Sequence, residues 1–396
     1  MTEAFIIDGV RSPIGKGKPG GALSGLHPAQ LLGSVITALL ERTGIDPGEV
    51  DDVVVGCVSQ AGEQSGNIGR MAWLGAGLPV HVPAVTVERK CGSSQQALHF
   101  AAQGIAAGAY DIVIVAGVES MSRVPMGCSR IGMDPYGPDV IERFAPVSQG
   151  VAAELVAARY KISREEMDAY AARSHALAAQ AADSGAFDAE IVPIARPDGD
   201  PVTADEPIRR GTTVEKLAGL APSFVDEAAA ARFPEITWSV TAGNSSQITD
   251  GAAAMLIVSD RKAAALGLRP RARFAGFAVC GEDPVEMLTA PIPATRKVLE
   301  RSGLTLADLA HYEVNEAFAS VPLAWQAALD ADPAKLNPRG GAIALGHPLG
   351  ASGVRLMVTM LGALEAGGGR YGLQTMCEAG GMANATVIER VEGGRA

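Results

Sequence analysis

The chain has 396 residues, of which 47% are hydrophobic and 47 are glycine, a composition typical of a well-packed α/β protein with many tight turns. Its formal net charge of -11 argues against duplex nucleic acid as a partner. A polyanionic cofactor is compatible with this charge, because a helix end or a local basic cluster can hold phosphate.

The five cysteines are widely spaced and form no CxxC pair. This pattern argues for a reducing compartment and against both a disulfide framework and a cysteine-rich zinc site. The first nine residues read as a strand and lack the basic and apolar regions of a signal peptide. No run of about 18 uninterrupted apolar residues exists, so no membrane span is expected. The chain is therefore predicted to be soluble and cytoplasmic.

Strands and helices alternate along the first third of the chain. Apolar residues recur at helical spacing in some segments and form short continuous runs in others. The expected elements, in chain order, are a strand at 4–8, a helix at 28–42, a strand at 50–57, a helix starting at 66–74, a strand at 82–87, a helix at 97–105 and a strand at 110–118. This alternation predicts a mostly parallel sheet with helices on both of its faces.

The same order of elements returns in the last third. Gly303 ends a helix and precedes a buried strand, as Gly44 does in the first third, and the offset is 303 − 44 = 259. The turn at Gly350 opens an apolar helix as the turn at Cys91 does, and 350 − 91 gives 259 again. The strand expected at 371–376 completes the repeat. Two separate elements that share one offset indicate an internal duplication.

A segment of different texture lies between the two halves. It holds Met-, Pro- and Gly-rich loops at 121–146, a helix that starts from a capping-box signature at Ser163 and runs to Ala182, and a short helix at 213–220. This texture predicts an insertion lying over one end of the duplicated core. The expected domains are residues 1–118 with 248–270 as the N-terminal half, 119–247 as the inserted loop domain, and 271–396 as the C-terminal half.

Cys91 is the first candidate functional residue. It follows a β-branched run and opens a helix, so it is expected at a strand-to-helix turn where unpaired N–H groups and the positive helix end favour a thiolate. Arg89 and Lys90 would lower the thiol pKa further if their charges reach it. The alternative is an inert buried cysteine, since free cysteine is among the most buried residue types.

Three further groups lie at turns and strand ends of the second half. His347 is in the glycine-rich turn equivalent to that of Cys91, Cys377 ends the last matching strand, and Asn315 ends the strand before it. Equivalent turns of two such halves would meet at one crevice, where two thiols, an imidazole and an amide make a complete acyl-transfer site. Each has an ordinary alternative: a turn histidine, an apolar strand end and a helix cap. The neighbouring Glu316 is expected to be a structural or solvated charge.

Several segments together resemble the thiolase family, the acetyl-CoA C-acyltransferases. The matching segments are Cys91-Gly92-Ser93-Ser94, residues 242–253 (AGNSSQITDGAA), Asn315-Glu316-Ala317-Phe318, residues 340–348 (GGAIALGHP) and the turn at Cys377. The resemblance covers essentially the whole chain. It implies an α/β fold in which two pseudo-symmetric halves form five αβαβα layers, with a loop domain inserted in the first half.

The resemblance also implies a role for each matching residue. Cys91 becomes the acyl-accepting nucleophile, His347 takes its proton, and Cys377 protonates the departing acetyl-CoA carbanion and then deprotonates the incoming coenzyme A. Asn315 and His347 would form one oxyanion hole, through a water, and the N–H groups of Cys91 and Ala379 a second. Ser246 matches a position that contacts the pantetheine arm. Coenzyme A is thus a substrate, with no permanently bound cofactor and no metal.

Departures from the family pattern bear on the substrate. Ser148-Gln149-Gly150 replaces a His-Met-Gly segment of acetoacetyl-specific relatives, Ala221 stands where some relatives have an arginine, and the connection from Met121 to Ser148 is short. These changes favour a degradative enzyme with a longer or bulkier acyl group. Residues 88–96 (ERKCGSSQQ) resemble actinobacterial lipid- and sterol-side-chain thiolases. Ala379 replaces a frequent glycine, which keeps the N–H but restricts φ.

The expected reaction cleaves a 3-oxoacyl-CoA with coenzyme A to acetyl-CoA and a shortened acyl-CoA, in fatty-acid or sterol side-chain β-oxidation. The alternatives are an acetoacetyl-CoA-specific biosynthetic thiolase and a non-catalytic thiolase-like binding protein. A condensing enzyme of the same fold would have histidine where this chain has Cys377, and no spacing supports a metal site. The expected partners are acyl-CoA, coenzyme A and further copies of the chain, as a homodimer or a dimer of dimers.

Overall fold

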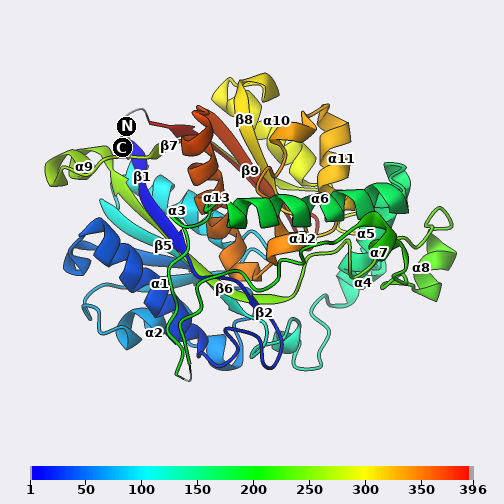
Figure 1. Ribbon diagram of the computed structural model, residues 1–396, viewed down its shortest axis with the longest axis horizontal. Coiled ribbons are helices and arrows are strands. Elements are labelled where there is room, and N and C mark those ends of the chain that lie inside the picture. The colour runs from blue at the N-terminus through cyan, green and yellow to red at the C-terminus, as the bar shows by residue number, and fades with distance from the viewer. Residues whose placement is uncertain (1, 198, 392–396) are drawn as a thin grey trace.

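The strands form one continuous hydrogen-bonded sheet in which the second half mirrors the first (Figure 1). The computed structural model describes residues 2–197 and 199–391. The strands of the first half are β1 (Ala4–Arg11), β2 (Gly15–Lys16), β3 (Asp52–Gly56), β4 (Ala84–Val87), β5 (Ile112–Ser120) and β6 (Thr249–Ser259). Those of the second half are β7 (Ala272–Gly281), β8 (Leu309–Val314), β9 (Tyr371–Glu378) and β10 (Met382–Arg390). Their order is β4-β3-β5-β6-β1-β7-β10-β9-β8, and β2 pairs with β6.

The two halves join where β1 pairs with β7 over only two residue pairs, Phe5 with Arg273 and Ile6 with Ala272. On either side of this joint the strands follow equivalent orders, β1-β6-β5-β3 and β7-β10-β9-β8. The start of β1 and the end of β10 lie close together beside the joint (Figure 1). The predicted duplication is thus visible as a mirrored order of strands.

Helices cover both faces of this sheet, and two of them pack between its two halves. The helices of the first half are α1 (Pro28–Thr43), α2 (Ile68–Gly75), α3 (Ser93–Ala106) and α9 (Asp260–Leu266). Those of the second half are α10 (Pro291–Ser302), α11 (Ser320–Leu329), α12 (Ala342–Leu345) and α13 (Ser352–Gly367). One apolar core joins α1 and α2 to the outer face of the first half, a second holds α3 and α13 between the halves, and a third lies under α10 and α11. These contacts produce the five layers that the family resemblance implied.

The central helices α3 and α13 begin at equivalent positions, since Ser93 and Ser352 are 259 residues apart. Their first turns cross closely, because Val354 N donates to Ser94 Oγ at 3.0 Å. The helical stretch Leu349–Gly367 is long and apolar enough to cross a membrane by length and composition alone, but 78% of its most apolar window is buried in the protein. This stretch is therefore explained as the core helix between the two half-sheets.

The expectation of a mostly parallel sheet was wrong. Only the pairs β3–β4, β3–β5 and β8–β9 are parallel among the described strands. The chain leaves β5 for the long insertion and returns through β6 beside it in the opposite direction, and β9 turns directly into β10. Two neighbouring strands that are joined by a tight turn or by a long insertion can pair antiparallel. A parallel pair needs a crossover connection between its two strands.

The insertion is more helical than its composition suggested. Its helices are α4 (Pro138–Phe144), α5 (Gln149–Arg159), α6 (Arg164–Asp183), α7 (Val214–Ala218) and α8 (Glu227–Arg232). The capping box predicted at Ser163 is present at the start of α6. The helices α4, α5 and α8 were not predicted, and α4 interrupts the expected loop at 121–146. They lie at one end of the molecule, at the right of Figure 1.

Candidate active site

Cys91 lies in a tight turn between β4 and α3, as its sequence context predicted. Lys90 just before it has a φ of 47°, which costs a non-glycine residue roughly 1 kcal/mol. Gly92 N donates to Arg89 O and Ser93 N donates to Lys90 O, so the turn is closed on itself. Cys91 is only 7% exposed. The backbone at Lys90 is thus strained, and this strained turn holds the Cys91 thiol at the start of a central helix.

The expected low pKa of Cys91 is wrong for the protein without substrate. Burial raises the pKa of this thiol to about 12, and the negative charges of Glu378 and Glu119 add to the effect. The N–H of Cys91 and the charge of Lys90 act in the opposite direction but do not outweigh burial. The free energy needed to remove a thiolate from water exceeds the stabilisation that one helix N-terminus gives it. The resting nucleophile is therefore a thiol that needs a base.

His347 supplies a base whose orientation is fixed by two neighbours. Its Nδ1 lies 2.6 Å from Ser352 Oγ, which in turn donates to Pro348 O at 2.9 Å, so Ser352 accepts a hydrogen bond from Nδ1–H. Its Nε2 lies 3.3 Å from Asn315 Nδ2 and accepts there. Burial and the charge of Arg355 lower the pKa of His347 to about 3, so the ring is neutral. A neutral ring with its lone pair on Nε2 is ready to receive a proton.

Cys377 is the second-last residue of β9, and the strand is followed by a turn with two glycines of positive φ, Gly380 at 93° and Gly381 at 78°. A side chain at Gly381 would meet Glu282 O at 2.6 Å, so glycine is required there. Ala379 has no positive φ, and alanine is therefore accommodated without strain. Among the described residues, the N–H groups of Cys91 and Ala379 make no hydrogen bond to another residue. Both can therefore receive an oxyanion.

The structure brings these segments of both halves together. Burial raises the pKa of Cys377, and the negative charge of a Cys91 thiolate raises it further. Cys91 also packs in one small apolar cluster with Leu349, two residues after His347. Among the described groups, the buried Asn315 Oδ1 has no hydrogen-bond partner in the protein, which fits an acceptor that receives a hydrogen bond from a water.

Two buried carboxylates brace the site. Glu119 accepts from Val58 N, Ser59 N, Gln64 Nε2 and Gly350 N at 2.8–3.0 Å, which ties the turn after His347 to the other half. Glu316 accepts from Tyr170 OH, Ser174 Oγ, Asn337 Nδ2 and Ile343 N, which links α6 of the insertion to the second half. Glu316 is therefore structural, as expected from the sequence.

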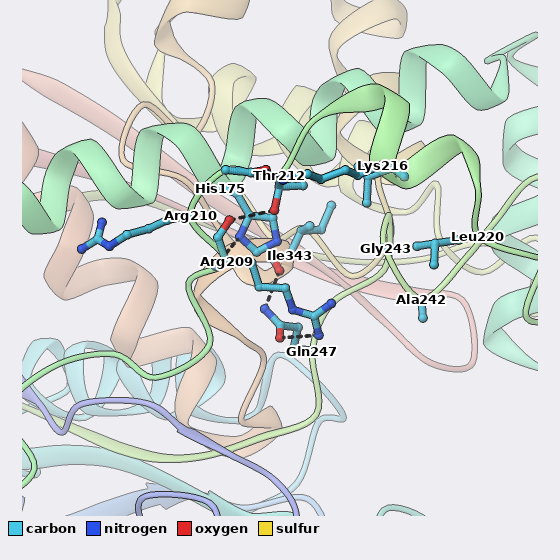
Figure 2. A pocket seen from close by; sticks show the side chains of 12 residues that line it. His175, Arg209, Arg210, Thr212, Lys216, Leu220, Ala242, Gly243, Gln247 and Ile343 are labelled. Atoms are coloured by element: carbon cyan, nitrogen blue, oxygen red, sulfur yellow. Dashed lines mark hydrogen bonds between the residues drawn. The ribbon is translucent and has the colours of Figure 1, made fainter.

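A basic pocket of ≈ 260 Å³ lies between the insertion and the second half (Figure 2). It is lined by His175, Arg209, Arg210, Gly211, Thr212, Lys216, Leu217, Leu220, Ala242, Gly243, Gln247 and Ile343. Arg209 reaches Gln247 Oε1 at 3.2 Å, while Arg210 points away from the other side chains and pairs with Asp183. Burial and the charge of Arg209 lower the pKa of His175 to about 4, so Arg209 and Lys216 supply the positive charge.

One residue that lines this pocket contacts the backbone of a catalytic residue. Gln247, which lines it, accepts a hydrogen bond from His347 N through its backbone oxygen at 3.0 Å. The predicted contact residue Ser246 stands next to Gln247 and is partly exposed, but it does not line the pocket, and its role stays a prediction. The pocket was not predicted. Its only local signal is the Arg209-Arg210 pair in an acidic chain, and its other side comes from distant segments.

Two family models match the chain, one described as thiolase, N-terminal domain, over residues 4–261 and one as thiolase, C-terminal domain, over residues 268–390. The chain is 47% identical to a steroid 3-ketoacyl-CoA thiolase of Mycobacterium tuberculosis, over 99% of this chain and 95% of that protein. It is 43% identical to a 3-oxoadipyl-CoA/3-oxo-5,6-dehydrosuberyl-CoA thiolase of Escherichia coli, over 99% and 100%. A crystal structure of the acetyl-CoA acetyltransferase of Bacillus anthracis superposes with a TM-score of 0.88 at 38% identity, over 99% of each chain.

Proposed function

The chain belongs to the thiolase family, and we propose that within it the protein acts on bulky 3-oxoacyl-CoA thioesters, those with a steroid-derived acyl group included. It is a degradative thiolase that cleaves a 3-oxoacyl-CoA with coenzyme A in β-oxidation. The observation that supports the finer substrate is the 47% identity to a steroid 3-ketoacyl-CoA thiolase across nearly the whole chain. The segment Ser148-Gln149-Gly150, distinct from acetoacetyl-specific relatives, supports the same substrate class.

The proposed first half-reaction joins Cys91 to the substrate. The sulfur of Cys91 attacks the ketone carbon C3 while His347 Nε2 takes the thiol proton, and burial of both groups favours a transfer concerted with attack. Asn315 and His347 stabilise the enolate oxygen that develops when the C2–C3 bond breaks. The Cys377 thiol then gives its proton to C2, and acetyl-CoA leaves. This step ends with an acyl group on Cys91 and a thiolate on Cys377.

The proposed second half-reaction returns the enzyme to its starting state. The Cys377 thiolate takes the proton from the thiol of coenzyme A, whose sulfur attacks the acyl carbonyl on Cys91. The N–H groups of Cys91 and Ala379 hold the oxygen of this tetrahedral intermediate. Breakage of the carbon–sulfur bond releases the shortened acyl-CoA, and His347 returns its proton to Cys91. All atoms and protons balance without a resident cofactor, and coenzyme A enters as a substrate.

We propose that the pocket of Figure 2 receives the phosphate-bearing part of coenzyme A. Its support is the positive charge of Arg209 and Lys216, together with the link from Gln247 to His347. Guanidinium and ammonium groups bind phosphate through charge-assisted hydrogen bonds. The pantetheine arm would then pass Ser246 on its way to the two sulfurs.

We also propose a homodimer, or a dimer of dimers, in the cytoplasm. Among the described strands, β4 is at the edge of the sheet, and α2, β4, α3 and the loop before β4 carry exposed apolar residues: Met71, Leu74, Val80, Val85 and Phe100. An unpaired apolar edge of this kind is commonly covered by another chain. All five cysteines are free, which supports a reducing compartment.

The experiment that tests the substrate measures kcat/KM for thiolysis of short, long and steroid-derived 3-oxoacyl-CoA thioesters, with Cys91→Ala as the inactive control. The proposal expects the steroid-derived thioester to exceed acetoacetyl-CoA by at least about tenfold. A preference for acetoacetyl-CoA would instead support the biosynthetic alternative, which the likeness to an acetyl-CoA acetyltransferase favours. Turnover that survives Cys91→Ala would remove Cys91 from its role.

A further inference from the structure

Glu378 is a buried carboxyl group beside the nucleophile that the mechanism above does not use. It follows Cys377 on β9 and is 0% exposed. A Cβ added at Gly92 would meet its Oε1 at 1.9 Å and Asn384 Nδ2 at 2.7 Å, so the carboxyl group rests directly against the Cys91–Gly92 turn. Asn384 meanwhile donates to Gly92 O at 3.0 Å. Only glycine at position 92 leaves room for this contact.

The duplication supplies a built-in comparison for Glu378. Glu119 stands 259 residues before it, at the same position of the equivalent strand β5. Glu119 receives four hydrogen bonds, one of them from Gly350 N, and Gly350 is the counterpart of Cys91. Among the described residues, both oxygens of Glu378 lack any hydrogen-bond donor. The same side chain thus has four donors that oppose the effect of burial on its pKa in one half, and none among the described residues in the other.

A buried carboxylate without donors is costly, so the neutral acid is favoured. Burial raises the pKa of Glu378 to about 8; the charge of Arg89 opposes this rise and that of Glu88 supports it. The other titratable groups facing it are the thiols of Cys91 and Cys377, and ionised Glu378 raises the pKa of both. Lys90 and Glu119 act on Cys91 from the same surroundings, with opposite signs.

We propose that Glu378 is a positioning residue for acyl transfer: its uncharged carboxyl group packs against the Cys91–Gly92 turn, and loss of its proton opposes formation of the Cys91 thiolate. The gain in rate at alkaline pH is therefore limited by the ionisation of Glu378, and not by that of Cys91, Cys377 or His347. Thiolysis rises less steeply with pH above about 8 than the titration of a lone thiol requires.

The test follows alkylation of Cys91 by iodoacetamide from pH 6.5 to 9.5, quantified by mass spectrometry of the Cys91 peptide in Glu378→Gln and in the unchanged protein. Glutamine keeps the shape but carries no charge. The alkylation rate of Glu378→Gln divided by that of the unchanged protein should be constant below pH 7 and rise by about three- to tenfold toward pH 9.5. A rise of this size is expected when a neighbouring negative charge raises the pKa of the Cys91 thiol by about half to one unit. Glu282→Gln, an exposed carboxylate beside the Gly381 turn, should leave the rates unchanged.

A ratio that stays constant across pH 8 overturns the proposal, because a purely structural effect changes the rate by one factor at every pH. If Glu378→Gln does not fold, the unchanged protein decides: its alkylation rate must bend near pH 8, and an unbroken single slope overturns the proposal. The inference takes from the proposed function only the nucleophilic role of Cys91. Alkylation needs no turnover, so a failed substrate assignment leaves this test intact.

Discussion

The hydrogen bond between His347 Nδ1 and Ser352 Oγ allows a quantitative prediction for Ser352→Ala. When His347 accepts the thiol proton, this 2.6 Å bond becomes one between a charged donor and a fully buried oxygen, since Ser352 is 0% exposed. Hydrogen bonds to charged groups contribute about 1.5–3 kcal/mol. Because 1.36 kcal/mol corresponds to tenfold in rate, kcat should fall by about 10- to 100-fold.

The assay compares kcat and KM for thiolysis with the rate of a single acylation of Cys91. The loss should appear in kcat and in acylation, with KM for coenzyme A unchanged. Ser320→Ala is a matched control, because Ser320 is also buried at the start of a helix and its Oγ has no hydrogen-bond partner among the described residues. A Ser352→Ala enzyme with activity within twofold of the unchanged protein would refute the assigned orientation of the imidazole.

Three further predictions address the second thiol, the basic pocket and the bracing carboxylate. Cys377→Ala should still be acylated at Cys91 by a simple acyl-CoA, from which coenzyme A leaves as a thiolate, but should lose about 10²- to 10⁴-fold in steady-state thiolysis, because the proton donor to C2 is missing; normal thiolysis would contradict the second-thiol role. Arg209→Ala should raise KM for coenzyme A about tenfold with little change in kcat. Arg210→Ala should leave this KM unchanged, because Arg210 is already paired with Asp183; equal effects of the two substitutions would contradict the binding of coenzyme A in this pocket. Glu316→Ala leaves the buried donors Tyr170 OH, Ser174 Oγ and Ile343 N unpaired and should lower the free energy of unfolding in urea by about 3–5 kcal/mol; an unchanged midpoint would argue against the structural role of Glu316.

Local pattern was sufficient for much of the fold. The helix α1 (Pro28–Thr43) and the strand β5 (Ile112–Ser120) lie within two or three residues of the expected ranges, because each has a clear apolar period and a marked end. The strand β10 and the helix α5 were missed. Small residues such as Ala152 and Ala153 in α5 and Ala383 and Ala385 in β10 fit several local structures, and only packing against distant segments selects one.

The sequence by itself determined the two repeated halves, the turn that carries Cys91 and the family motifs, since all of these are properties of neighbouring residues. Only the tertiary structure decided which protonation state is favoured for each ionisable group in the site. It removed water from Cys91 and so raised the pKa that its helix end was expected to lower. It also gave four donors to Glu119 and, within residues 2–197 and 199–391, none to Glu378. The energy of a charge depends on solvent and on groups hundreds of residues away, and no local pattern contains that information.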